Sequence, residues 1–253
     1  MKPKKSLGQN WLVDQDSLLS ILECAELNHS NLIVEIGPGT GNLTKLLIQK
    51  VKRVIAVEID QTLVEHLTQL KLENLELINQ DIRSFDFNKI NSPYKMVANI
   101  PYYLTSRLIR LISETSNRAD LVVLLVQKEI AERLNATKGK YSILGLSAQI
   151  FWDVRLGPII LRDKFEPVPK VDSQVVILKN NHLEYSDEIR KLLWLIKIGF
   201  RSKRKTLINN LKAANLDIDK IHHFYETNKL NLMARPSDLS LSDWSELSKL
   251  INN

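Results

Sequence analysis

Four consecutive residues, Asn99-Ile100-Pro101-Tyr102, have types that suit the binding of a flat aromatic amine. The Asn99 side-chain oxygen and the Ile100 carbonyl can each accept one N–H of an exocyclic amino group, and Tyr102 can stack on its ring. Pro101 restricts the backbone, which points the Ile100 carbonyl outward. Adenine N6 fits these groups. It is a poor nucleophile, and two acceptors stabilise the positive charge that develops as it attacks a methyl donor.

A glycine-rich turn, Gly37-Pro38-Gly39-Thr40-Gly41, lies upstream, between an apolar run and a helical pattern. Glycine allows a tight turn and the close approach of a ligand. The dinucleotide-binding pattern is Gly-x-Gly-x-x-Gly, and here the third glycine comes one residue early, because position 42 is Asn. The turn therefore predicts a nucleotide-like cofactor and argues against a nicotinamide dinucleotide.

Acidic residues stand at the ends of the next two predicted strands. Glu58 lies about 20 residues beyond the turn, where a carboxylate can bind ribose hydroxyls. Asp81 can accept from an adenine amino group, with Ile59 and Ile82 against the ring. Each feature alone is also explained as a turn, a strand end or a helix cap, and the Asn99 segment as a proline turn. Their joint order at successive strand ends predicts methyl transfer onto an adenine nitrogen.

Composition sets broader bounds. The chain has 253 residues, 44% of them hydrophobic, enough for one large domain or two modest ones. Its net charge of +6 favours a polyanionic partner. The single cysteine, Cys24, excludes an internal disulfide, and we expect it to be buried in a helix.

The histidines lack metal-ligand spacing, so no metal is predicted. Apolar runs are too short for a membrane span, and no secretion signal is present, which predicts a cytoplasmic protein with an organelle left open.

Short apolar runs alternate with helical patterns, which predicts an α/β fold with a parallel sheet covered on both faces. The predicted strands are residues 32–36, 54–58, 75–79, 96–99, 121–126, 152–160 and 174–178. The helices predicted with them are residues 16–27, 43–50, 62–70, 105–113 and 127–135. After a polar hinge at 179–182, only helices are predicted, at residues 187–198, 203–214, 217–228 and 243–251, the last capped by Ser240 and Asp243.

Seven stretches resemble the small-subunit ribosomal RNA adenine N6,N6-dimethyltransferases, which have the class I S-adenosylmethionine-dependent, Rossmann-like methyltransferase fold. They are residues 5–12, 35–44, 99–106, 126–134, 165–173, 200–207 and 234–240, and they span nearly the whole chain. The resemblance implies a catalytic S-adenosylmethionine-binding domain at residues 1–180, beginning with a basic arm or lid at 1–14. It also implies a small all-helical RNA-binding domain at residues 186–253.

The resemblance further implies an activity and its site. Methyl groups would pass from S-adenosyl-L-methionine to N6 of two adjacent adenosines near the 3′ end of small-subunit ribosomal RNA, leaving S-adenosyl-L-homocysteine. Phe165 would form the second wall of the base pocket, opposite Tyr102. The residues implied at the cofactor are Gln9, Asn10, Leu12, Gly37, Gly39, Glu58, Asp81 and Asn99.

Cations near both ends of the chain are predicted to contact the RNA. They are Lys4, Lys5, Arg201, Lys203, Arg204 and Lys205. The helix predicted at 203–214 would pack its apolar side inward and turn cations to the RNA, although an ordinary solvated helix face is the alternative. The expected partner is small-subunit ribosomal RNA or the immature small subunit, bound by a monomer with no membrane association.

Other functions compete with this one. A large-subunit dimethyltransferase of the macrolide-resistance type shares the N-terminal half of the pattern. A DNA adenine methyltransferase fits less well, because the remaining length leaves no room for a separate target-recognition domain. A non-catalytic RNA-binding assembly factor or transcription factor on the same fold is the third alternative, and the intact residues Gly37, Glu58, Asp81, Asn99 and Tyr102 argue against it.

Overall fold

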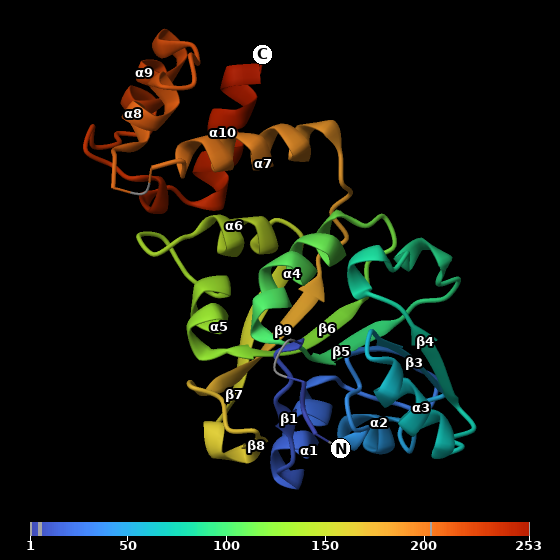
Figure 1. The fold of residues 1–253 in the computed structure, drawn as a ribbon. Helices are drawn as coiled ribbons and strands as arrows, with labels where there is room; N and C mark the ends of the chain where they lie inside the picture. Colours follow the sequence, from blue (N-terminus) through green and yellow to red (C-terminus); the bar gives the residue numbers. More distant parts are fainter. Residues whose placement is uncertain (1, 5–6, 203, 253) are drawn as a thin grey trace. The chain divides into compact units, whose positions relative to one another are not determined.

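The computed structural model describes residues 2–4, 7–202 and 204–252 (Figure 1). The chain divides into two compact units, which are described separately. The sheet unit comprises Met1–Glu132 and Trp152–His182, and the helical unit comprises Arg133–Phe151 and Leu183–Asn253. The domain limits expected from the sequence, 180 and 186, flank the second junction. Whether independent domains fold at those limits stays a prediction.

The sheet unit is built on seven strands in the order β4-β3-β2-β5-β6-β9-β7. They are β2 (Leu32–Ile36), β3 (Arg53–Glu58), β4 (Leu75–Asn79), β5 (Lys95–Asn99), β6 (Leu121–Gln127), β7 (Trp152–Ile160) and β9 (Ser173–Asn180). The strands from β2 to β6 pair in parallel, whereas β9 pairs antiparallel with both β6 and β7. The predicted, mostly parallel sheet is confirmed, and its central strands β2, β3, β5 and β6 are largely buried apolar runs.

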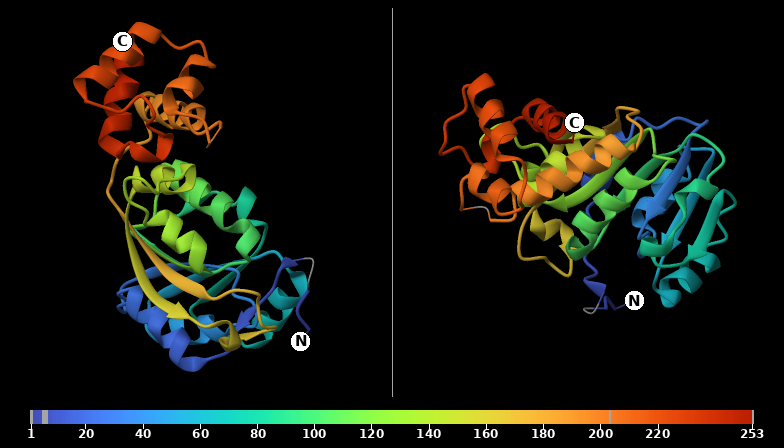
Figure 2. Two further views of the ribbon diagram at one scale, coloured as in Figure 1. Left: turned by 90° about the vertical axis from the view of Figure 1, so that its left-hand side faces the viewer. Right: turned by 90° about the horizontal axis from the view of Figure 1, so that it is seen from above.

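Helices cover both faces of this sheet (Figure 2). One face carries α1 (Gln15–Cys24), α2 (Asn42–Leu47) and α3 (Gln61–Gln69), and the other carries α4 (Thr105–Glu114) and α5 (Lys128–Leu134). Among the residues placed by the structure, no helix has the length and apolar character needed to cross a membrane.

Two expectations about this unit are wrong. Cys24 lies in α1, as expected, but it is the last residue of that helix and is only partly buried. Residues 179 and 180 belong to β9 and not to a hinge. Asn180 is buried, and its N–H donates to the Asp120 carbonyl at 3.0 Å, so the strand continues two residues beyond the last apolar position.

The helical unit contains α6 (Ile143–Gln149), α7 (Asp187–Gly199), α8 (Leu207–Lys212), α9 (Ile218–Thr227) and α10 (Leu241–Asn252). Its core is organised around Trp244, which is fully buried and stacks on Phe200 with ring centroids 6.0 Å apart. A Cβ at Gly199 would lie 2.2 Å from the Trp244 ring, so this glycine makes room for the tryptophan. The predicted cap of α10 is confirmed, because Ser240 and Asp243 exchange backbone-to-side-chain hydrogen bonds of 2.8 and 3.2 Å.

A helix lies within the predicted range 203–214, but α8 begins only at Leu207, so the expectation that this helix carries the basic cluster is wrong. Arg201, Arg204 and Lys205 lie in the connection between α7 and α8. Asn210 explains this, since its Nδ2 donates to the carbonyls of Gly199 at 2.7 Å and Ser202 at 3.1 Å and so holds the connection in a non-helical course. The predicted RNA-contact residues Lys5 and Lys203 lie outside the described part of the chain.

Candidate functional site

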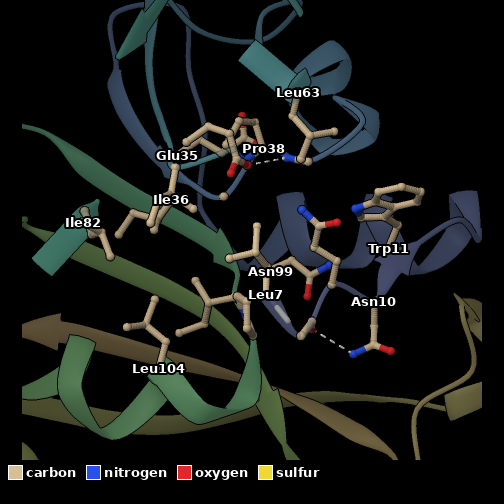
Figure 3. A pocket seen from close by; sticks show the side chains of 18 of the residues that line it. Leu7, Asn10, Trp11, Glu35, Ile36, Pro38, Leu63, Ile82, Asn99 and Leu104 are labelled. Carbon is tan, nitrogen blue, oxygen red and sulfur yellow. Dashed lines mark hydrogen bonds between the residues drawn. The ribbon is translucent and has the colours of Figure 1, made fainter. Parts of the chain in front are cut away.

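The chain order of the parallel strands reverses between β2 and β5, and a pocket opens at their carboxyl ends. Open α/β sheets bind ligands at such a switch point. Every residue that the sequence predicted at the cofactor or the target base lines this one pocket. Figure 3 shows Asn99 between Ile82 on one side and Trp11 on the other. The structure thus brings the predicted residues together, while their individual roles stay predictions.

The glycine turn forms one side of the pocket. Gly39 has a φ of 58°, which favours glycine, and a Cβ there would lie 3.2 Å from the Trp11 ring. The Gly39 N–H donates to Glu58 Oε2 at 3.3 Å, and the Asp60 N–H donates to Glu58 Oε1 at 2.9 Å. Glu58 therefore ties the turn after β2 to the end of β3. Burial raises the pKa of Glu58, and these two backbone bonds act in the opposite direction.

Asp60 is a site residue that sequence reasoning missed. Its side chain is buried, and it accepts from Lys4 Nζ at 2.6 Å and from Gln9 Nε2 at 3.1 Å. The Lys4 N–H in turn donates to Gln9 Oε1 at 2.7 Å. Burial would raise the pKa of Asp60, but the bonds from Lys4 and Gln9 outweigh it and lower the pKa. Asp60 thus anchors the N-terminal arm beside Glu58, and Lys4 faces a carboxylate in this structure.

A two-stranded sheet, also unpredicted, holds the rest of the arm. In it β1 (Trp11–Leu12) pairs antiparallel with β8 (Phe165–Glu166), with Leu12 opposite Phe165. Asn42 Nδ2 donates to the Leu12 carbonyl at 3.0 Å. Two-residue strands carry no readable periodicity, so only the wider family pattern pointed to this segment. The pairing places Phe165, a predicted wall of the base pocket, under the arm.

Asp81 lies at the third strand end, as predicted. Its carboxylate caps the short 3-10 helix Ile82–Ser84, accepting the Arg83 N–H at 2.9 Å and Arg83 Nε at 2.7 Å. The hydrogen bonds from Arg83 lower the pKa of Asp81, so it is ionised at neutral pH. A carboxylate has enough lone pairs to accept from an adenine amino group as well.

The Asn99 segment closes the pocket on the side of β5. Asn99 ends that strand, and no other described residue hydrogen-bonds its side-chain amide. Pro101 opens the 3-10 helix Tyr102–Leu104. Tyr102 Oη and the fully buried Ser173 Oγ lie 2.8 Å apart, a contact across 71 residues that sequence reasoning missed. Burial raises the pKa of Tyr102, so its phenol stays neutral, and the contact with Ser173 orients the ring.

A family model described as ribosomal RNA adenine dimethylase matches residues 1–253. The chain belongs to this family. The family prediction, the class I methyltransferase fold and the enzyme class are thereby confirmed.

Relatives and solved structures that are similar to this chain are consistent with its place in this family. It is 40% identical to the ribosomal RNA small subunit methyltransferase A of Mycoplasmopsis pulmonis, over 98% of each chain. It is 37% identical to that of Nostoc sp., over 99% of this chain and 98% of the relative. A solved dimethyladenosine transferase from Plasmodium falciparum has a TM-score of 0.78 and 27% identity, over 93% of this chain and 95% of its own. The 23S rRNA methyltransferase ErmE, at 22% identity with a TM-score of 0.77 over 96% of this chain and 100% of its own, shows a shared fold only.

Ribosomal RNA adenine dimethylases depend on S-adenosylmethionine, and the pocket of this member fits that cofactor. Among the described residues, two buried polar atoms at the pocket have no hydrogen-bond partner, Trp11 Nε1 and Glu35 Oε2. Buried polar groups in proteins are normally paired, so these two point to a polar ligand. Carboxylates at Glu58 and Asp81 supply acceptors for hydroxyl and amino groups, and glycines leave room above the turn.

Glu35 has a raised pKa, which the sequence did not predict. It is 1% exposed, and burial raises its pKa to about 8, with the Glu58 charge acting in the same direction. Between its ordinary pKa of 4.5 and about 8, the folded chain holds a proton that the unfolded chain lacks. The stability linked to this proton is complete below pH 4.5 and is lost as the pH rises towards 8.

We expect Glu35→Gln to flatten the fall in unfolding free energy between pH 4.5 and 8. In the wild type, the raised pKa of Glu35 lowers the unfolding free energy by up to about 5 kcal/mol as the pH rises through this range, because each pKa unit corresponds to 1.36 kcal/mol. Urea unfolding at several pH values measures it. Glu76→Gln, at the exposed ion pair with Arg53, is the matched control and should keep the wild-type slope. A slope equal to wild type in Glu35→Gln would contradict the expectation.

We expect Asp60→Asn to loosen the arm and to weaken S-adenosylmethionine binding about 3- to 10-fold. A neutral amide loses the charge that attracts Lys4, but Lys4 is partly exposed, so the effect is below that of a fully buried pair. Titration calorimetry gives the affinity, and the rate of tryptic cleavage near Lys4 reports arm release. If neither quantity differs from wild type, Asp60 does not anchor the arm.

Proposed function

We propose that this chain transfers methyl groups from S-adenosyl-L-methionine to N6 of two adjacent adenosines near the 3′ end of small-subunit ribosomal RNA. The product would be N6,N6-dimethyladenosine, made during ribosome biogenesis with release of S-adenosyl-L-homocysteine. Family membership already makes the chain a ribosomal RNA adenine dimethyltransferase. One observation carries the rest: the unpartnered amide of Asn99 opens into the same pocket as Gly39 and Glu58.

The cofactor side of the pocket suits a nucleoside with a charged tail. Glu58 would hold the ribose hydroxyls, Asp81 the adenine amino group, and Ile59 and Ile82 the faces of the adenine. Gln9, Asn10 and Leu12 on the arm, with Gly37 and Gly39, would enclose the methionine end. When bound, the cofactor supplies an electrophilic methyl group on its sulfonium.

The acceptor side uses groups of the chain itself. Asn99 Oδ1 and the Ile100 carbonyl would accept the two N–H groups of adenine N6, which draws the nitrogen towards tetrahedral geometry and stabilises the charge developing on it. Tyr102 and Phe165 would clamp the base, which must leave any stack to enter. Ser173 would hold the Tyr102 ring through the 2.8 Å contact between their hydroxyls. Catalysis would rest on orientation and fixed dipoles, with no general base, because N6 becomes positively charged once the methyl group has moved and then loses its acidic proton to water.

The substrate is proposed to be the RNA of the immature small subunit, met by a cytoplasmic monomer. On the helical unit, Arg201, Arg204 and Lys205 are exposed and available to phosphates. Lys4, also predicted as an RNA contact, is paired with Asp60, so we assign it to the arm anchor first.

Mass spectrometry of small-subunit RNA from cells with and without the protein tests this function. We expect two adjacent dimethyladenosines to disappear with the protein. Labelled methyl transfer in vitro should favour immature small subunits over naked large-subunit RNA. The opposite preference would establish the large-subunit alternative, and no transfer to either RNA would establish a binding protein.

A further inference from the structure

The loop at residues 231–235 of the helical unit exposes two large apolar side chains next to each other. Leu232 is 59% exposed and Met233 is 72% exposed, the highest value among the large apolar side chains that the structure describes. Single exposed apolar residues are ordinary in soluble proteins, and two in sequence present a larger apolar surface to a partner.

The exposure comes from a loop that is held in place. The Met233 N–H donates to Asn231 Oδ1 at 2.8 Å, and the Ala234 N–H donates to the Asn231 carbonyl at 2.8 Å. Ala234 is itself buried, and its carbonyl accepts the Leu207 N–H at 2.8 Å. The turn is therefore tied at both sides, and it presents Leu232 and Met233 to solvent in a fixed backbone conformation.

Exposed cations lie on the segment that hydrogen-bonds to this loop. The bond from Leu207 to Ala234 places the loop beside the connection that carries Arg201, Arg204 and Lys205. The Gly139 N–H donates to the Ser237 carbonyl at 2.7 Å, which joins the segment with the exposed Lys140 to the residues that follow the loop. Within the described residues, no carboxylate pairs with Arg201, Arg204, Lys205 or Lys140.

Of the two nearby acids, Asp243 is paired with a cation, and Asp238 accepts a backbone N–H. Asp238 accepts the Arg235 N–H at 2.7 Å, and Asp243 pairs with Lys138 at 3.2 Å. An apolar pair beside unpaired positive charge suits a partner that is both polyanionic and able to offer a flat apolar face. A paired RNA helix offers mainly phosphates and hydroxyls, whereas an unpaired nucleotide also offers the face of its base.

We propose that Leu232 and Met233 pack against an unpaired base of the small-subunit ribosomal RNA, while these cations hold its phosphates. The partner rests on the proposed function, but the contact is separate from the methylation pocket. It supplies affinity that does not depend on counterion release, and it favours RNA with a bulged or single-stranded nucleotide at this position.

The experiment measures binding of the full chain to immature small subunits over a series of salt concentrations. We expect Leu232→Ser combined with Met233→Ser to weaken binding about 10-fold at every salt concentration, leaving the slope of log affinity against log salt unchanged. Arg204→Gln combined with Lys205→Gln should instead reduce that slope by about 1 to 2. Leu232→Met with Met233→Leu keeps the apolar surface and should bind like wild type.

Controls separate this contact from general damage and from the methyl-transfer function. Ile218→Ser, at a half-exposed residue at the start of α9, should bind like wild type. Cofactor affinity should be equal in all variants. Wild-type affinity in the serine double variant, or a changed salt slope, would overturn the contact while leaving the proposed methylation intact. A wild-type dimer that dissociates in the double variant would also overturn it, by assigning the surface to a second copy.

Discussion

Asn99→Ala is expected to lower methyl transfer to small-subunit RNA by about 10³-fold or more, with S-adenosylmethionine affinity within a few-fold of wild type. The prediction depends on the free amide at the end of β5. Because no described residue hydrogen-bonds it, the Asn99 Oδ1 is available for the target amine, and its removal leaves the fold around it unchanged.

The expected loss of rate is large because the positive charge develops on adenine N6, next to Asn99. In free adenine the N6 lone pair is shared with the ring, and it becomes available only as the nitrogen turns tetrahedral. Asn99 Oδ1 acts on the charged transition state more than on the neutral base, so its loss lowers the rate constant more than it weakens binding. The Ile100 carbonyl, which no side-chain substitution removes, accounts for residual activity.

Single-turnover rates with saturating cofactor measure the chemical step, and calorimetry gives the cofactor affinity separately. Asn99→Asp is the informative companion variant, because it keeps an acceptor oxygen and adds a charge. The thermal unfolding midpoint of both variants should match wild type. A rate within 10-fold of wild type for Asn99→Ala would remove this residue from the chemistry.

The sequence predicted those parts of the molecule that depend on neighbouring residues. Glycines, acids and the Asn99 segment each follow an apolar strand, and parallel strands deliver such residues to one edge of the sheet. Strands β2, β3, β5 and β6 were found for the same reason, since each is a local apolar run. Family resemblance added Phe165 and the arm, whose own residues show no pattern.

Contacts between distant segments were not predictable. From the sequence, Asp60 is expected only to cap a helix. Its ion pair with Lys4 forms only when the N-terminal arm folds against α3. Ser173 meets Tyr102 across the sheet, and nothing near either residue indicates the pair. The helix expected from residue 203 starts at Leu207, because Asn210 bonds to the preceding connection, a tertiary effect that outweighs helix propensity.

Glu58→Ala is expected to weaken S-adenosylmethionine binding about 100-fold. In the structure the carboxylate accepts the N–H groups of Gly39 and Asp60, so it both shapes the glycine turn and presents its remaining lone pairs to the pocket. Hydrogen bonds to a charged acceptor contribute roughly 1.5–3 kcal/mol each, and one or two of them to ribose hydroxyls correspond to this loss of affinity.

Glu58→Gln separates the two tasks of the carboxylate. The amide keeps one acceptor oxygen, but its NH2 faces a backbone N–H, so we expect an intermediate loss of about 10-fold. Burial raises the pKa of Glu58, and only the ionised form accepts on both oxygens. Wild-type affinity should therefore fall as the pH is lowered through that pKa, and Glu58→Gln should lose this dependence. Calorimetry at several pH values tests both points, and unchanged affinity in Glu58→Ala would place the ribose site elsewhere in the pocket.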